Sequence, residues 1–354
     1  MSTTVPSAAR PTLRTLGALA GVSAMTVSLA LRNHPSLPAS TRRRLRKLAA
    51  AHGYRPDPAV AKLMHHLRTS RGQRRQSTLC GLCLQSPPGE RLDYGAAVLS
   101  GARNRADSLG FGLDVMAIDE PGLTPRRLER ILVNRGIAGL LLLPMREPVH
   151  LDRLIDWSRF SAVSATPSVL SPRLNDAMPD LFGNMLLLCR ELALRGCRRI
   201  GLVPVAEHDV RVNHRVLAPY LWHIHFGGGA AVPPLIIPQY EPDPGALRAW
   251  IARHHPDAII SNGEPTVSQI HEFLTARQRR TITLASTTLH STATARFAGI
   301  LDNASEVGAA AVEMLAAAVQ RGETGPPETP RTTLIGGRFF APKSSAIGFS
   351  RAAR

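Results

Sequence analysis

The chain has 354 residues, 44% of them hydrophobic, which is enough for a sizeable core and for more than one domain. Its net charge is +17, and residues 1–75 supply +13 of it, because they hold fourteen Lys and Arg residues against one acidic residue, Asp57. Such a local excess is typical of a protein that binds a polyanion, since each neutralised phosphate releases condensed counterions. No stretch approaches the length of a membrane-spanning helix, and residues 1–10 lack the apolar run of a secretory signal, so we expect a soluble, cytoplasmic chain with no membrane partner.

The N-terminal headpiece is predicted over residues 12–57, after a flexible lead of residues 1–11. Two short segments of helical periodicity in Leu13–Arg32 are joined by Ala20-Gly21-Val22-Ser23, a connection short enough to indicate a helix-turn-helix. Thr12 is placed to cap the first helix, and Ser23 to cap the second by accepting a bond from an N–H near Thr26. The predicted inner face of the first helix is Leu13, Leu16, Leu19 and Ala20.

The second helix has two different faces. At about 100° per residue, the inward positions are Val27, Ala30 and Leu31, and the outward positions are Met25, Ser28, Leu29 and Arg32. A helix that reads a DNA groove needs one face buried in the protein and another face exposed to the DNA. An ordinary pair of core helices shows the same faces, so this segment alone leaves both interpretations open.

A third helix and a hinge are predicted next. Ala39–Ala51 forms the helix, and Gly53 ends it. Its apolar side faces inward and its basic residues cover the rest. The inward positions are Leu45, Leu48 and Ala49. Residues 54–58 contain two prolines and cannot continue a helix, whereas Ala59–Arg68 can but is too short to be stable alone. Residues 58–76 are therefore predicted to form a hinge helix and linker.

Residues 77–341 alternate between apolar runs and helical patterns, which predicts parallel sheets with helices on both faces. The expected strands are Leu79–Leu84, Gly112–Ile118, Ala138–Leu143, Ser161–Val163, Arg199–Val203, Pro234–Pro238, Asp257–Ile260, Thr281–Ala285, Gly299–Leu301 and Thr332–Ile335. The expected helices are Gly95–Leu109, Pro125–Arg135, Leu151–Trp157, Gly183–Arg195, Val210–Phe226, Gly245–His254, Thr266–Ala276 and Ser305–Arg321. Two such sets in series predict two lobes with a ligand cleft between them, followed by a tail of residues 342–354.

Four cysteines are too few for a disulfide framework in a chain of this length. Cys80 and Cys83 have the spacing of half a zinc site, but they lie in an apolar run that is typical of a buried strand. Residues three apart in a strand point to opposite faces, so both sulfurs do not easily reach one metal. We expect buried structural thiols, no metal and no cofactor.

Several motifs resemble the lac repressor/galactose repressor family of bacterial helix-turn-helix transcription regulators. In the headpiece these are Thr12-Leu13, Ala20–Ser23, Thr26–Ser28, Thr41-Arg42 and Gly53–Pro56. In the body they are Ile137–Pro144, Arg195–Gly201, Asp257–Ile260 and Gly336–Phe339. The resemblance covers most of residues 12–340. It implies an all-α headpiece, a two-lobed periplasmic-binding-protein-like α/β body, a homodimer on a near-palindromic DNA operator, and a small-molecule effector of the sugar or nucleoside class.

The resemblance also implies which residues contact DNA. Ala24, Met25 and Leu29 occupy the positions that read bases in the major groove. An arginine is usual where Leu29 stands, so we expect an apolar contact there, for instance to a thymine methyl, with packing against a neighbouring helix as the alternative. The residues expected to bond phosphate oxygens are Thr12, Ser23, Thr26, Ser28, Arg32 and Thr41. Leu13 and Tyr54 complete the headpiece set.

In the hinge, Leu63 matches the family's leucine that is inserted into the minor groove, and Lys62 lies beside it. Such a wedge unstacks a base step at a cost that added contacts offset. The alternative is that Leu63 only packs two hinge helices together.

The effector residues implied by the resemblance lie near the predicted crossovers and in lobe two. They are Asp180, Arg211, Trp222, Asn262, Glu264 and Asp302. Trp222 has the residue type that stacks on a sugar, although a helix tryptophan is more often part of a core. The family's usual aspartate after the strand Asp257–Ile260 is absent, which leaves the effector class open and permits a regulator without a ligand.

Parts of the sequence suggest two other functions. An enzyme is suggested by Gly227–Gly229 and by His223 and His225, but no Lys-Ser/Thr follows the glycines and no third metal ligand is in register, so we expect no catalysis. A periplasmic sugar receptor would fit the body alone. The basic headpiece and the missing signal sequence argue against it.

Overall fold

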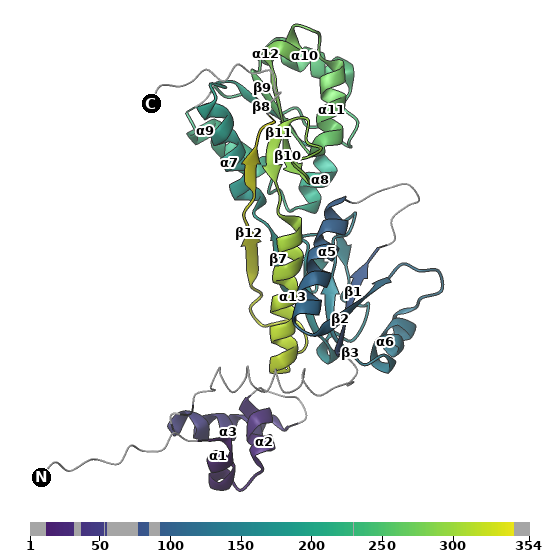
Figure 1. The fold of residues 1–354 in the computed structure, drawn as a ribbon, viewed down its shortest axis with the longest axis vertical. Coiled ribbons are helices and arrows are strands. Elements are labelled where there is room, and N and C mark those ends of the chain that lie inside the picture. Colours follow the sequence, from purple (N-terminus) through teal and green to yellow (C-terminus); the bar gives the residue numbers. More distant parts are fainter. Residues whose placement is uncertain are drawn as a thin grey trace, which may run out of the picture.

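The computed structural model describes residues 12–31, 37–52, 54, 77–84, 93–228 and 230–342. It contains a helical headpiece and a two-lobed α/β body (Figure 1). The predicted lead, the hinge and almost all of the tail lie outside the described residues. So do three of the predicted DNA contacts, Arg32, Lys62 and Leu63.

The headpiece consists of α1 (Leu13–Ala20), α2 (Ala24–Leu31) and α3 (Ala39–Ala51). Their buried core is Leu16, Val27, Ala30, Leu45 and Ala49. The sharp turn between α1 and α2 uses Gly21 in the left-handed conformation, with φ of 66°. The inward faces predicted for α2 and α3 are confirmed. The one predicted for α1 is wrong at Leu19, which is 61% exposed, because the short helix buries only the strip around Leu16.

Lobe one has a parallel sheet of six strands in the order β12-β7-β5-β3-β1-β2. Its strands are β1 (Ser77–Cys83), β2 (Phe111–Ala117), β3 (Ile137–Leu142), β5 (Ser161–Ser164), β7 (Asn175–Pro179) and β12 (Thr332–Ile335). Its helices are α5 (Asp93–Ser108), α6 (Pro125–Asn134) and α13 (Ala304–Arg321). Alternate residues of β1 pack on opposite faces: Leu79 contacts the α5 and α13 side, whereas Cys80 and Leu82 contact the α6 side. The predicted sheet covered on both faces is therefore present.

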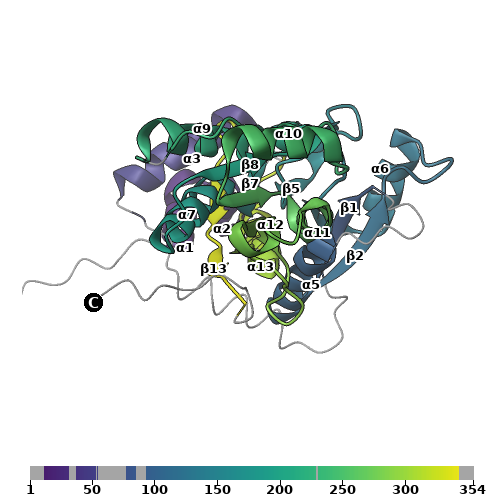
Figure 2. The same cartoon turned by 90° about the horizontal axis from the view of Figure 1, so that it is seen from above.

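Lobe two has five strands in the order β13-β11-β10-β9-β8. These are β8 (Ile200–Val203), β9 (Ala258–Ser261), β10 (Thr283–Leu289), β11 (Ala298–Leu301) and the antiparallel edge strand β13 (Arg338–Phe340). The helices are α7 (Leu181–Leu194), α8 (Ala206–Arg211), α9 (Leu217–Phe226), α10 (Pro244–His254), α11 (Gly263–Phe273) and α12 (Gln278–Thr281). Seen from above, α7 lies to one side of the sheet and α11 to the other (Figure 2).

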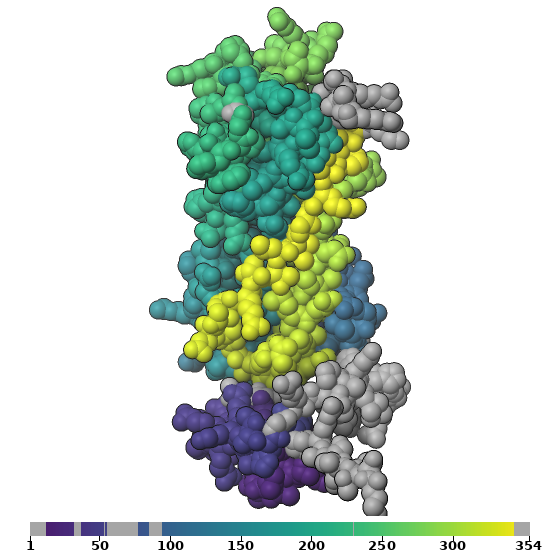
Figure 3. Space-filling model, turned by 90° about the vertical axis from the view of Figure 1, so that its left-hand side faces the viewer, coloured from purple at the N-terminus to yellow at the C-terminus, as the bar shows by residue number. Residues whose placement is uncertain are grey.

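The lobes are interleaved along the chain rather than built in series. The described chain crosses between them after β7, after β11 and after β12. As a result α13 packs on α5 in lobe one, and the C-terminal segment runs along both lobes as the yellow band of Figure 3. The approach of α5 and α13 is very close, because a Cβ at Gly101 or Gly308 would lie 1.9 Å from a backbone oxygen of the other helix. Thus α13 and β12 complete lobe one, although they follow most of lobe two in the sequence.

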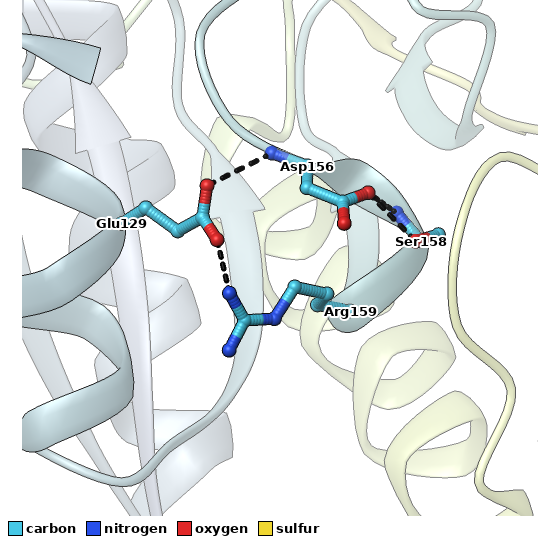
Figure 4. Close-up of polar contacts among 4 residues, drawn as sticks. All are labelled: Glu129, Asp156, Ser158 and Arg159. Carbon is cyan, nitrogen blue, oxygen red and sulfur yellow. Dashed lines mark hydrogen bonds and ion pairs between the residues drawn. The ribbon is translucent and has the colours of Figure 1, made fainter. Parts of the chain in front are cut away.

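The helix predicted over Leu151–Trp157 is wrong. The segment instead follows β4 (Val149–His150), which pairs with β6 (Val169–Ser171), and ends in a short 3-10 helix, Trp157–Arg159. Trp157 Nε1 donates to the Leu151 carbonyl at 2.9 Å, and both side chains are buried. Figure 4 shows how Glu129 of α6 accepts from the Asp156 N–H and pairs with Arg159. The apolar residues whose spacing predicts a helix are therefore buried by tertiary contacts, and no helix forms.

The helix predicted over Val210–Phe226 is divided into α8 and α9. Asn213 and His214 between them have φ of 54° and 59°, which no α-helix allows. The buried carboxylate of Asp209 holds this break, since it accepts from the Val216 and Leu217 N–H groups at 3.2 and 2.9 Å.

The strand predicted over Pro234–Pro238 is also wrong, because only a single bridge, Val205 to Ile237, forms there. Its prolines have no N–H to donate to a neighbouring strand.

Candidate DNA-binding face and interlobe cavity

The two predicted helix caps of the headpiece are confirmed. Thr12 Oγ1 accepts from the Thr15 N–H at 3.2 Å, and Thr15 Oγ1 accepts from the Thr12 N–H at 2.7 Å. At the second helix, Ser23 Oγ accepts from the Thr26 N–H at 3.1 Å. These bonds satisfy N–H groups that have no partner inside the helix, and they fix the entry of both helices.

The outer face of α2 presents apolar rather than polar side chains. Met25 is 66% exposed and Ala24 is exposed, whereas Ser28 and Leu29 are half-buried. Leu29 is not part of the described headpiece core. Among the other predicted contacts, Thr41 is half-buried, and Leu13 and Tyr54 pack against that core.

The headpiece carries unneutralised positive charge. Residues 12–54 contain no acidic residue. Exposed basic side chains of α3 are Arg43, Arg44, Arg46 and Lys47. Arg44 donates to the Ala20 carbonyl at 3.5 Å, which places one guanidinium at the C-terminal end of α1. The arrangement favours a polyanionic surface next to α2 and α3.

The body has a cavity of ≈ 230 Å³ between the two lobes. Lobe one contributes Tyr94, Met145, Thr166 and Ser168 to its wall. Lobe two contributes His208, Arg211, Tyr240, Asn262, Thr287 and His290. Asp302 lies at the crossover from β11 to α13 and lines the same cavity. A ligand there would contact both lobes at once.

Three of the six predicted effector residues line the cavity: Arg211, Asn262 and Asp302. Asp180 lies next to the cavity wall, where its Oδ1 accepts from the Gly183 N–H at 2.9 Å and caps α7. Trp222 and Glu264 lie outside the wall.

Trp222 is 49% exposed and packs against Phe226, with the ring centroids 5.8 Å apart. Glu264 accepts from the Arg296 N–H at 2.9 Å.

The sequence reasoning missed Tyr94, His208, Tyr240 and His290. They come from four separate segments, and only the fold brings them together.

Arg211 is the centre of one polar group in the cavity. Its NH1 donates to the Arg146 carbonyl of lobe one at 3.1 Å, and its NH2 lies 2.7 Å from His208 Nδ1 and 3.4 Å from Tyr240 Oη. Burial, and then the charge of Arg211, lower the pKa of His208 to about 3. His208 is therefore neutral at physiological pH, and its Nδ1 accepts from the guanidinium.

A second group in the cavity contains buried polar atoms without a hydrogen-bond partner in the described structure. They are Tyr94 Oη, Asn262 Nδ2 and Asp302 Oδ2. Asn262 and Asp302 are 2% and 5% exposed. Asp302 Oδ2 lies 3.2 Å from His290 Nδ1, an ion-pair distance without hydrogen-bond geometry. Burial, followed by the charge of Asp302, raises the pKa of Tyr94, so its hydroxyl stays protonated. Unsatisfied groups of this kind are costly unless something binds them.

A basic helix-turn-helix headpiece followed by a two-lobed α/β body defines a class of DNA-binding transcription regulators with a periplasmic-binding-protein-like body. The comparisons relate the headpiece to one family within this class. Residues 12–57 match the model of bacterial regulatory proteins, lacI family. The match identifies a lacI-family headpiece over residues 12–57, and the two-lobed body that follows agrees with the predicted family and fold class. The family consists of DNA-binding regulators rather than enzymes.

Solved structures share the fold of most of the chain at low identity. A transcriptional regulator CelR–cellobiose complex has a TM-score of 0.57 at 18% identity, over 94% of this chain and 99% of that chain. The lac repressor bound to ONPG in its repressed state has a TM-score of 0.53 at 15% identity, over 93% and 98%. The trehalose repressor from Escherichia coli has a TM-score of 0.54 at 15% identity, over 75% and 100%. No curated protein matches the sequence.

Two further properties of the described residues bear on function. No single helix among them is long and apolar enough to cross a membrane, and the pair α1 and α2 meets that test only when joined across a bend of 102°. Within the same residues, no three His, Cys, Asp or Glu side chains are placed to hold a metal ion.

Proposed function

We propose that the protein is a homodimeric repressor that binds a near-palindromic operator and responds to a small hydroxylated molecule, of the sugar or nucleoside class, in the interlobe cavity. The observation that carries this proposal is the joining of an acid-free, exposed helix-turn-helix to a body whose cavity wall comes from both lobes. The helix-turn-helix binds DNA, and the cavity of the body is able to bind a ligand.

For DNA, we propose that α2 enters the major groove and that Ala24, Met25 and Leu29 contact bases there. The hydroxyls of Thr12, Ser23, Thr26 and Thr41 lie at or near helix starts, and that of Ser28 lies in the middle of α2; all five are proposed to contact phosphates. Lys62 and Leu63 of the hinge and Arg32 complete the proposed contacts. Because Met25 and Leu29 have no hydrogen-bonding groups for base edges, phosphate contacts are expected to carry much of the affinity.

For the effector, the proposal rests on the buried atoms of Tyr94, Asn262 and Asp302 that have no hydrogen-bond partner among the described residues. A hydroxylated ligand offers both donors and acceptors, so it satisfies all three. The cellobiose complex of the regulator CelR is a related fold with a sugar bound, which supports this class of ligand.

The test is selection of bound duplexes from random DNA, followed by fluorescence anisotropy with the selected duplex. We expect a palindrome with a deformable central step and an affinity that falls steeply as salt rises, with slope near −0.9 per neutralised phosphate. An asymmetric or absent sequence preference would overturn the repressor assignment. Mass photometry of the complex tests the dimer, and operator release or tightening by added sugars and nucleosides tests the effector.

A further inference from the structure

Residues 216–240 form an uncharged segment of lobe two. They contain no Asp, Glu, Lys or Arg, although charged residues make up 19% of the chain. The segment includes all of α9, and each of the other described α-helices of the body contains at least one charged residue. Figure 1 shows α9 at the left-hand margin of lobe two. A helix in such an outer position normally carries charged residues on the side that faces water.

The exposed face of α9 is apolar. Its exposed side chains recur at helical spacing and form one stripe, called here the α9 stripe: Ala218, Leu221, Trp222, His225 and Phe226. Leu221, Trp222 and Phe226 are 37%, 49% and 73% exposed. The opposite face is apolar too, since Tyr220 is buried and its hydroxyl donates to the Ile200 carbonyl at 3.0 Å. A helix that is hydrophobic on all sides is normally covered on all sides, so the α9 stripe indicates an interaction surface.

A hollow of ≈ 60 Å³ lies beside the α9 stripe, where α7 and α9 end. Its wall is mostly apolar, with Arg198 as the charged residue among the described ones, and it includes Ala193, Cys197, Ile200, Ile224 and Ala230. The exposed ring of Phe226 lies at the same end of α9. A surface that has both a protruding ring and a hollow is suited to pairing with a copy of itself about a twofold axis, because each copy supplies both features.

The charge of the protein also favours a second copy of the chain as the partner. With a net charge of +17, two copies repel each other wherever their basic surfaces approach. The α9 stripe has no Lys or Arg, so two copies can meet there with the least repulsion. An acidic partner, which the basic surfaces attract, would gain no ion pair from this stripe.

The apolar area indicates a weak contact rather than an obligate dimer. A fully buried Phe or Trp removes about 150–250 Å² from water, so the exposed parts of Trp222 and Phe226 offer about 200–300 Å² per copy. Even with Leu221 added, a twofold pair of stripes falls short of the roughly 1,200 Å² at which stable interfaces begin. Such a contact is suited to joining assemblies that already form through another surface.

We propose that the α9 stripe joins two dimers of this protein into a tetramer, with the stripes of two copies packed against each other about a twofold axis. The proposal rests on the proposed function, since it takes the dimer as the unit that associates. A tetramer has two DNA-binding dimers, so it can hold two operators at once. Because the contact is weak, association is strengthened when both operators lie on one DNA molecule.

Sedimentation velocity of the full-length protein, from about 0.5 to about 100 μM, measures this association. We expect the wild type to shift from dimer to tetramer over that range. Trp222→Glu and Phe226→Glu should each raise the dissociation constant of the tetramer at least about 10-fold, because each places two carboxylates in a twofold apolar contact. Both substitutions lower the net positive charge and so reduce overall repulsion, which means that a loss of tetramer reports on the stripe itself.

Val133→Glu is the matched control. Val133 is 44% exposed on α6 of lobe one, so the substitution makes the same change of charge on an exposed apolar residue outside the α9 stripe. This variant should associate as the wild type does. All three variants should bind a single operator with unchanged affinity, since none of the substituted residues belongs to the headpiece. If one stripe variant does not fold by circular dichroism, the other variant and the wild-type concentration series still decide.

A second measurement uses two operator duplexes that carry different fluorophores. The wild type should bring both duplexes into one complex, detected as two-colour coincidence. The stripe variants should bind either duplex but not join them. This readout depends on the contact between dimers and not on the affinity of one dimer for DNA.

Three results would overturn the inference. The wild type stays dimeric at every concentration, which would leave the α9 stripe to another occupant; the stripe variants form tetramers as the wild type does; or the stripe variants become monomers, which would make the stripe the dimer contact itself. Sequence-specific DNA binding separates these failures from that of the proposed function. A dimer that binds its selected palindrome but never forms a tetramer refutes only the role of the stripe, whereas a protein without sequence-specific DNA binding refutes the regulator itself.

Discussion

Gly308→Ala perturbs the contact between α5 and α13, on which lobe one is built. A Cβ at residue 308 would lie 1.9 Å from the Val98 carbonyl oxygen and 2.8 Å from the Ala102 nitrogen. Both are backbone atoms of α5, so no side-chain rotation relieves the clash. Because ordinary Cβ contacts are 3.4–4 Å, the two helices must separate by about 1.5–2 Å in a densely packed interior.

Two effects of opposite sign determine how much the free energy of unfolding changes. Overpacking of this kind costs about 1–3 kcal/mol, and a backbone contact belongs at the upper end of that range. Alanine in a helix interior is about 1 kcal/mol more favourable than glycine. We therefore expect the free energy of unfolding to fall by about 2 kcal/mol. The assay is urea unfolding followed by fluorescence, in which Trp157 reports on lobe one because it is buried there.

Gly336→Ala is the control for this substitution. A Cβ at residue 336 meets no atom within 4 Å, and the residue is not among the positive-φ glycines, so its unfolding midpoint should match the wild type. Equal stability of Gly308→Ala and Gly336→Ala would refute the reasoning. Gly308→Ala should also weaken effector binding, because Tyr94 lies in the first turn of α5 and Asp302 lies two residues before α13.

Three further predictions concern pH, capping and operator choice. Because the pKa of His208 is lowered in the folded state, the unfolded chain binds a proton more readily than the folded chain between about pH 3 and 6.5. The contribution of His208 to stability is therefore fully present above pH 6.5 and declines as the pH falls. In thermal melts, His208→Gln should lose less stability than the wild type between about pH 7 and pH 4. Thr12→Ala should cost the headpiece about 1 kcal/mol in urea unfolding followed by circular dichroism, and an unchanged headpiece would contradict the capping role. Leu29→Arg should add a guanine to the selected operator, with about 1–3 kcal/mol of discrimination at that base pair, and an unchanged selection would place residue 29 away from the groove.

The headpiece was predicted well because its determinants are local. The caps of Thr12 and Ser23 and the glycine turn at Gly21 depend on residues that lie within a few positions of one another. The error at Leu19 has a local cause too: an eight-residue helix has just over two turns, so one apolar residue can lie off the buried strip without changing the pattern.

The body was predicted in its elements but not in its connections. The apolar runs of β1, β3 and β9 identify buried strands. No pattern in the sequence indicates that α13 and β12 belong to lobe one. The division of α8 from α9 depends on the buried carboxylate of Asp209, a tertiary environment that periodicity does not contain. For the same reason the cavity residues Tyr94 and Tyr240 were missed.

The position of Arg211 links ligand binding to the arrangement of the lobes. This side chain belongs to α8 of lobe two, lines the cavity, and donates to the Arg146 carbonyl of lobe one. A ligand shifts the equilibrium between lobe arrangements only by its difference in affinity for them. An effector that binds Arg211 and the lobe-one residue Tyr94 together contacts both lobes, so its affinity must depend on their separation. Operator affinity can then respond to the ligand without any contact between ligand and headpiece, and that response should be lost in Arg211→Gln while ligand-free operator binding remains.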